Sequence, residues 1–360
     1  MAASDTRIPD YGRCALPLPS LAGSSADSPG TPSAGLSAVP AAGSPAAAPW
    51  LLRDEPVSAV SGARFAFCSR LGGSSAPPYD SLNVSTSTGD DPAVVARNRR
   101  IILDALGVGG READLVTCNQ VHGDDVVVLR DPAAESAYDE SAYEESAYDE
   151  SVYDESAYDE SVYDESAYDE SAYDESGVAG GGSGSLVFTS VADAQSAASA
   201  GADAVVCLAG GVPVMLAFAD CVPVILVAGT GAFAVVHSGW RGTLAGISGK
   251  ALSILARESG CPPAECNAYI GPHIGPCCYE VSGELLGRFT ETWGPACDAG
   301  SEAPHLALAA AVRESLLRAG ADGTRIAESG ICTACHTDMW YSHRAEMGRT
   351  GRHAAAAVLA

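Results

Sequence analysis

Three side chains that lie far apart along the chain, His122, Cys221 and His237, have the chemistry to bind one metal ion. Each follows or ends a short apolar run and is bracketed by small or turn-forming residues. Two imidazoles and one thiolate suit zinc, and three protein ligands leave a fourth position open, as in catalytic zinc sites. The other interpretation is that Cys221 is a buried core thiol and that both histidines are hydrogen-bonded loop residues. The residues alone leave both interpretations open.

The same residue types also support chemistry of other kinds. Cys221 as nucleophile and His237 as base would make a metal-free cysteine hydrolase or deamidase, which has no need of His122. One cysteine with two histidines also binds copper in blue-copper proteins, so a copper-dependent phenol oxidase is a further hypothesis. A four-copper oxidase is disfavoured, because the chain has only seven histidines and no His-X-His pair.

Short apolar runs position the cysteine and the second histidine. Val212–Phe218 and Val222–Val227 flank the segment that contains Cys221, and Ala232–Val236 leads directly into His237. These runs are rich in Val, Ile and Leu and are bounded by Gly and Pro, which predicts buried strands of a covered sheet. Residues at strand ends are held by a rigid scaffold and can be directed into a cleft.

The remaining elements predict an α+β fold in a single domain. Asp91 as N-cap and Pro92 in the first turn predict a helix start. Strands and helices mix without strict alternation, which favours α+β over a doubly wound sheet. Strands are predicted over 63–69, 126–129, 204–208, 266–270 and 355–359, and helices over 92–106, 190–199, 244–258, 285–292 and 306–319.

Two segments are predicted to be disordered. Residues 1–56 are dominated by Ala, Ser, Pro and Gly, and they lack both a secretory apolar core and the arginines of a mitochondrial presequence. We expect a cytoplasmic protein, with a plastid transit peptide as the alternative. The domain over 57–360 is interrupted at 133–185 by a Gly/Ser linker and by eight five-residue units, mostly Ser-Ala-Tyr-Asp-Glu. Such dense negative charge without apolar periodicity is typical of disorder.

The net charge of −26 comes largely from this repeat, which supplies 16 negative charges. The acidic remainder argues against nucleic acid as a partner, and without an apolar run of 18 residues we predict no membrane span. A scaffold protein whose functional part is the repeat is another hypothesis. It predicts that deleting 133–185 abolishes activity in cells, whereas an enzyme would keep nearly unchanged catalysis.

Twelve cysteines without a secretory signal predict reduced thiols rather than a disulfide framework. Cys332, Cys335 and His336 spell the Cys-X-X-Cys-His motif of c-type haem attachment. Because the chain shows no export signal, we interpret this match as coincidence. Cys277 and Cys278 are interpreted as core or loop thiols.

Several motifs occur in a specific order along residues 63–359, outside the repeat. They are NQVHG at 119–123, ADCVP at 219–223, HSGWRG at 237–242, Ile270–Pro272 with Tyr279–Val281, and Tyr341–Arg344, preceded by Ser81–Asn83, Gly89–Pro92 and Asn98-Arg99. Together they resemble the multicopper-oxidase-type laccase-domain family, whose members are regarded as purine nucleoside phosphorylases. The chain departs from that pattern at Ser238, usually alanine, and at Ala345, usually a second arginine.

The resemblance implies two mixed β-sheets packed together with flanking helices. It implies a catalytic Zn²⁺ bound by His122, Cys221 and His237, with copper as the alternative metal. The implied activities are phosphorolysis of adenosine, inosine and methylthioadenosine and deamination of adenosine, so that the partners are purine nucleosides and phosphate. The oligomeric state is not predicted.

Four further residues are candidates for binding or catalysis. Phosphorolysis needs a cationic phosphate clamp, for which Arg241 beside His237 is the first candidate and Arg99 the second. A structural salt bridge is the alternative role of Arg241. Asn83 is predicted to hydrogen-bond ribose or base, although it also suits a turn. Asp220, beside Cys221, is predicted to orient a ligand or to act as a base.

Overall fold

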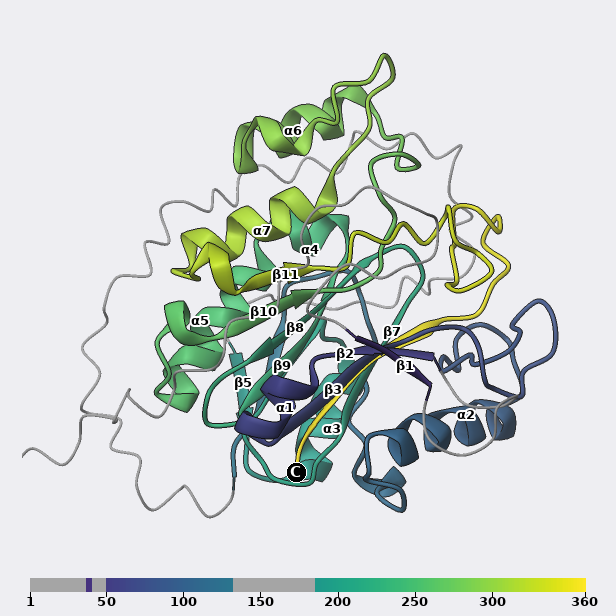
Figure 1. Cartoon of the computed structure of the whole chain (residues 1–360), viewed down its shortest axis with the longest axis vertical. Helices are drawn as coiled ribbons and strands as arrows, with labels where there is room; N and C mark the ends of the chain where they lie inside the picture. Colours follow the sequence, from purple (N-terminus) through teal and green to yellow (C-terminus); the bar gives the residue numbers. More distant parts are fainter. Residues whose placement is uncertain (1–36, 41–49, 132–184) are drawn as a thin grey trace, which may run out of the picture.

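The computed structural model describes residues 37–40, 50–131 and 185–360, and these form two sheets with helices on both outer faces (Figure 1). One sheet has five strands in the order β1-β2-β3-β12-β7, and the other has seven in the order β11-β10-β8-β9-β6-β4-β5. The five-stranded sheet contains β1 (Ser37–Pro40), β2 (Trp50–Arg53), β3 (Ala63–Cys68), β7 (Val214–Phe218) and β12 (His353–Leu359). The seven-stranded sheet contains β4 (Val126–Leu129), β5 (Ser185–Phe188), β6 (Ala204–Cys207), β8 (Val222–Val227), β9 (Phe233–Ser238), β10 (Asn267–Ile270) and β11 (Ile326–Glu328).

The central core lies between the two sheets. Phe67 and Leu216 from the five-stranded sheet pack with Ile225 and Val235 from the seven-stranded sheet, and all four are at most 1% exposed. Alternate residues of a strand point to opposite faces, so Val236 lies in a second core on the other side of its sheet. Both faces of the central strands of this sheet are covered, which explains why β6 and β8 are apolar along their whole length. The predicted buried strands are confirmed.

Helices cover the outer faces (Figure 1). α5 (Ile247–Ser259) packs on the seven-stranded sheet, α7 (Leu308–Arg318) packs beside α5, and α6 (Gly283–Trp293) packs on α7. α2 (Pro92–Ala105) packs on the five-stranded sheet. α1 (Glu55–Ser61) and α3 (Val191–Ala200) add side chains to the core between the sheets, and the short α4 (Trp240–Leu244) follows β9. None of the helices in the described ranges combines the length and apolar character needed to span a bilayer.

The predicted start of α2 is confirmed, with Asp91 as the N-cap residue and Pro92 in the first turn. The Asp91 carboxylate accepts a hydrogen bond of 2.8 Å from the backbone N–H of Ala93, and Pro92 occupies the first helical position. The cap satisfies a backbone donor that the helix itself leaves without a partner, while proline has no N–H to satisfy.

The α+β class with two packed sheets is confirmed, with two corrections. The expectation of two mixed sheets is correct only for the seven-stranded sheet, because every pairing in the five-stranded sheet is antiparallel. The prediction that 1–56 is disordered is wrong for 37–40 and 50–56, because β1 pairs with β2 and because Leu51 and Leu52 in β2 are fully buried. This apolar dipeptide is too short to stand out from the Ala/Pro-rich composition around it. Residues 1–36, 41–49 and 132–184, with most of the predicted insertion, lie outside the described residues.

A buried histidine at the start of β12 makes stability sensitive to acid. His353 is 1% exposed and packs against the rings of Phe218, Trp340 and Tyr341. Burial, together with the charge of Arg352, lowers the pKa of His353 to about 3. In the unfolded chain the same imidazole titrates near its ordinary value of about 6.5. Between these two values the unfolded state binds the extra proton, so acidification favours unfolding.

We expect the free energy of unfolding to fall more steeply in the wild type than in His353→Leu between pH 7 and pH 5. The difference should be about 2 kcal/mol, since each pH unit between the two pKa values contributes about 1.4 kcal/mol. Urea denaturation of both proteins at the two pH values measures it. Parallel pH profiles for the two proteins would contradict this assignment.

Candidate metal and catalytic site

Three widely separated segments bring His122, Cys221 and His237 together. One ligand atom from each lies within 4.8 Å of the others, and Cys221 Sγ is 3.7 Å from His122 Nε2. The two imidazole rings meet edge to face, with centroids 4.9 Å apart. His237 is 3% exposed, while the other two side chains are half-buried. The three potential ligand atoms therefore form one cluster that is partly, not fully, buried.

Strand pairing explains why Cys221 and His237 are neighbours. β8 and β9 pair antiparallel in a register that sets Pro223 opposite His237, so the residue preceding β8 lies at the same sheet end as the last residues of β9. The turn into β8 needs a positive φ of 82° at Asp220. Aspartate is one of the few residues that tolerate this conformation.

The third ligand comes from the loop before β4, where His122 has a φ of 61°. Gly239 makes room for both imidazoles, because a Cβ at this position would lie 2.6 Å from His122 Cδ2 and 3.4 Å from His237 Cε1. Glycine in the Ser-Gly-Trp turn is therefore required by close approach of the rings.

A fourth residue, Asp203, organises the cluster and was missed in the sequence. Its fully buried carboxylate lies 2.6 Å from His237 Nδ1 and accepts backbone N–H hydrogen bonds from His122 (3.1 Å) and Gly123 (2.7 Å). Nε2 is then the His237 nitrogen left for a metal. The available signal was a single carboxylate at the start of the apolar run 204–208, where burial of an acid requires partners.

The electrostatics of the site favour a deprotonated thiol. Burial by itself disfavours the Cys221 thiolate, but the nearby His237 and His122 outweigh it and lower the pKa of Cys221 to about 6. Burial likewise disfavours the imidazolium form of His237, but the Cys221 thiolate and Asp203 raise its pKa to about 10. The thiolate is the form of cysteine that binds metals and attacks electrophiles.

Asp220 lies beside the cluster and is committed to loop contacts. One of its oxygens accepts a hydrogen bond of 2.6 Å from the Thr333 hydroxyl, and the other accepts one of 2.6 Å from the backbone N–H of Arg344. Its own carbonyl accepts from the N–H of Ile274 at 2.9 Å. These contacts position the segments around Cys221, and a role for Asp220 as a base stays a prediction.

Arg241 is exposed on α4, directly after β9, and its guanidinium lies 4.6 Å from the centroid of the Trp240 ring. Arg99 on α2 donates a hydrogen bond of 2.8 Å from Nε to the carbonyl of Val84. Of these two cations, Arg241 is therefore the one attached to the end of the sheet that carries His237.

Asn83 is fully buried, and its amide is used inside the loop that leads to α2. It donates to the carbonyl of Ser85 and to the side chains of Thr88 and Asp90, and it accepts from the N–H of Arg352. This matches the turn role considered for Asn83. Its binding of substrate, like that of Arg99, stays a prediction.

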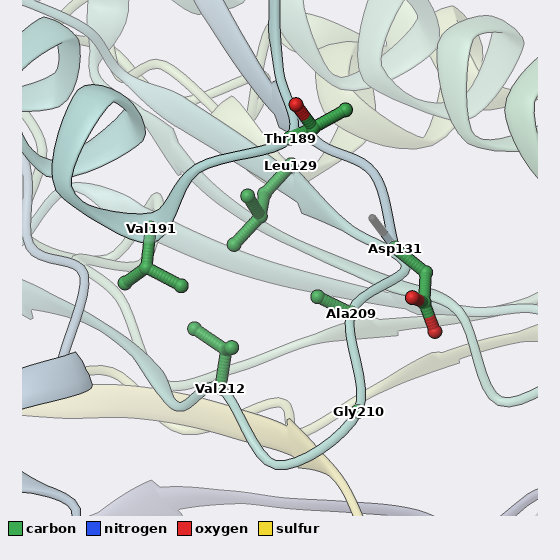
Figure 2. Close-up of a pocket in the computed structure, with 7 residues that line it drawn as sticks. All are labelled: Leu129, Asp131, Thr189, Val191, Ala209, Gly210 and Val212. Atoms are coloured by element: carbon green, nitrogen blue, oxygen red, sulfur yellow. The ribbon is translucent and has the colours of Figure 1, made fainter. Parts of the chain in front are cut away.

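A separate pocket of about 290 Å³ lies at the opposite ends of β4 and β6 from the metal cluster (Figure 2). His122 precedes β4 and Asp203 precedes β6, whereas the pocket is formed by residues at and after the ends of these two strands. Its lining residues are Leu129, Asp131, Thr189, Val191, Ala209, Gly210 and Val212. It contains none of the predicted site residues.

The family model described as multi-copper polyphenol oxidoreductase laccase matches residues 64–157 and 185–360. The chain therefore belongs to this family. It is 29% identical to the purine nucleoside phosphorylase YlmD of Geobacillus stearothermophilus, over 84% of this chain and 92% of the relative. It is 30% identical to the purine nucleoside phosphorylase SCO2081 of Streptomyces coelicolor, over 81% of this chain and 94% of the relative.

The adenosine deaminase RL5 of an unknown prokaryotic organism is 34% identical, but over 42% of this chain and 60% of the relative. The crystal structure of YlmD from Geobacillus stearothermophilus superposes with a TM-score of 0.62 at 27% identity, covering 86% of this chain and 95% of that chain. The fold is thus shared along nearly the whole length of the solved relative.

Proposed function

We propose that this protein is a zinc-dependent purine nucleoside phosphorylase that also deaminates adenosine. Its substrates would be adenosine, inosine and methylthioadenosine, together with phosphate. The observation that carries the proposal is the cluster of His122, Cys221 and His237 held by Asp203. Two relatives that match most of the chain are named purine nucleoside phosphorylases, and a third is named an adenosine deaminase.

The donor set fits zinc. One thiolate and two imidazoles are usual protein ligands of zinc, and the usual support is a hydrogen bond that the remaining imidazole N–H donates to a buried carboxylate. Zinc with three protein ligands supplies a Lewis acid with one open position. Copper accepts the same donors, so the metal content of the protein decides between the two.

The residues of the chain have distinct roles in this proposal. Asp203 holds His237 in the tautomer that directs Nε2 toward the ligand cluster. Phosphorolysis breaks the bond from the base to the sugar and attaches a phosphate oxygen to the same sugar carbon, through a cationic sugar. Arg241 would hold the phosphate, because a planar guanidinium forms paired, charge-assisted hydrogen bonds with phosphate oxygens.

A metal-free cysteine hydrolase is the second candidate, and the lowered pKa of Cys221 favours it. The full-length protein distinguishes the two when its metal content is measured and adenosine is supplied with and without phosphate. We expect about one zinc ion per chain at the cluster of His122, Cys221 and His237. Adenosine should be converted to inosine without phosphate, and the free purine base should form only when phosphate is present. A protein that shows no nucleoside turnover and whose zinc content is the same in Cys221→Ala as in the wild type, while Cys221 of the wild type reacts with thiol reagents, would favour the hydrolase.

Arg241→Ala should lower phosphate-dependent turnover by about 10- to 100-fold in kcat/KM, since charged hydrogen bonds contribute about 1.5–3 kcal/mol. Deamination of adenosine uses no phosphate and should stay nearly unchanged, which makes it an internal control. Arg241→Lys should recover part of the loss, because it keeps the charge without the paired geometry. Equal losses in both reactions would instead indicate the salt-bridge role.

A further inference from the structure

Four cysteines outside the catalytic cluster form a second group of metal ligands. Cys277 and Cys278 lie in the loop after β10, and Cys332 and Cys335 lie in the loop after β11. Their four sulfur atoms all lie within 4.8 Å of one another. β10 and β11 pair in parallel, so the two loops leave the sheet at the same edge, where His273 and Cys332 form a further bridge.

The sulfur separations suit a tetrahedral ion. Cys335 Sγ is 3.6 Å from Cys277 Sγ and 3.4 Å from Cys278 Sγ. Four sulfurs at about 2.3 Å from a central zinc ion are about 3.8 Å apart. A disulfide requires about 2.05 Å, so the sulfurs are spaced as metal ligands rather than as bonded pairs. Four thiolates in tetrahedral array select zinc or an iron–sulfur centre over magnesium or calcium.

The backbone around the cluster is shaped to hold thiolates. The N–H of Gly275 donates to Cys332 Sγ at 3.2 Å, and a Cβ on that glycine would lie 3.1 Å from Cys332 Cβ and 3.3 Å from Cys277 Sγ. A larger residue at 275 would enter the space between the sulfurs.

We propose that Cys277, Cys278, Cys332 and Cys335 bind one structural zinc ion that clamps the two loops together. All four positions are filled by protein ligands, which is the arrangement of structural rather than catalytic zinc. β11 has only three residues, so its pairing with β10 gives the following loop little support. This proposal replaces the interpretation of Cys277 and Cys278 as core or loop thiols. The Cys-X-X-Cys part of the haem-like motif then has a function of its own.

The two cysteine-containing loops also form hydrogen bonds with Asp220, the residue next to Cys221. Thr333, between two of the cysteines, donates its hydroxyl to Asp220, which precedes the ligand Cys221. Ile274, beside Gly275, donates its N–H to the carbonyl of Asp220. The structural zinc would therefore fix the segment that directs Cys221, which makes these loops positioning elements rather than catalytic ones.

The zinc content of purified full-length variants tests the proposal, independently of enzymatic activity. Cys277→Ser/Cys335→Ser should lose about one zinc ion per chain relative to the wild type, because hydroxyls replace two of four thiolates. Cys261→Ser/Cys266→Ser is the matched control, since these thiols are also close neighbours, 3.7 Å apart, but lie outside the cluster. It should keep the wild-type zinc content. Unchanged zinc in the first variant would overturn the proposal.

Two further measurements cover the other outcomes. Should the double variant fail to fold, Cys335→His keeps a Cys₃His zinc set and should retain the ion, whereas loss of zinc there would contradict a tetrahedral site. Thiol titration of denatured, unreduced wild type should find all four cysteines free, and four missing thiols would identify disulfides instead. Iron in place of zinc in the metal analysis would also overturn the proposal.

The two zinc sites are separable. Cys221→Ala removes a ligand of the catalytic cluster alone and should leave the ion of the four cysteines bound. If the four-cysteine zinc is present and nucleoside turnover is absent, the proposed function fails and this inference stands. If nucleoside turnover is present and Cys277→Ser/Cys335→Ser keeps all the zinc of the wild type, the inference fails and the proposed function stands.

Discussion

Cys221→Ala is expected to release the catalytic metal and to lower both phosphorolysis and deamination by about 10⁴-fold or more, as the loss of a central catalytic group does in other enzymes. His122→Ala should have a comparable effect, because the two residues bind the same ion. Zinc content and single-turnover rates with adenosine, with and without phosphate, measure both effects.

A comparison of Cys221→Ala with His122→Ala also distinguishes a zinc enzyme from an enzyme that uses Cys221 as its nucleophile. A cysteine–histidine pair would need Cys221 and His237 but would keep most of its rate in His122→Ala. Cys207→Ala is a suitable control, because this thiol is fully buried in the core between the sheets and is not part of the cluster. It should lose stability without losing the metal.

Asp203→Asn should weaken zinc binding and turnover by about 10- to 100-fold, which is the usual effect of removing the carboxylate behind a metal-ligating histidine. The amide matches the carboxylate in size, but its NH₂ group cannot accept the N–H groups of His122 or Gly123. One buried donor is left without an acceptor, so stability should fall by about 1–3 kcal/mol as well. Zinc titration by calorimetry and urea denaturation measure the two effects.

Asp124→Asn is the matched control for this substitution. Asp124, which lies in the same loop and is 41% exposed, forms an ion pair of 2.8 Å with Lys250. An exposed pair contributes at most about 1 kcal/mol, and this carboxylate does not contact the ligands, so zinc affinity should stay unchanged. Equal zinc affinity in the wild type and Asp203→Asn would show that Asp203 does not orient His237.

Local signals in the sequence determined a large part of the fold. Apolar runs bounded by Gly and Pro predicted β7, β8 and β9, and a capping aspartate with a following proline predicted the start of α2. These signals work because strand burial and helix capping depend on residues close together in the chain. The three candidate metal ligands could also be named from the sequence, because each follows or ends a short apolar run, although the residues alone left a structural role open.

Only the tertiary structure decided which distant residues meet. Asp203 is unremarkable in an alanine-rich stretch until the fold places it behind His237. Cys277 and Cys335 are separated along the chain by the whole of α6 and α7, and they become neighbours because β10 and β11 pair in parallel. Strand order and register depend on contacts between segments far apart in the chain, and no local pattern encodes them. The sequence thus determined which residues are candidate ligands, and the packing of the two sheets determined which residues lie beside them.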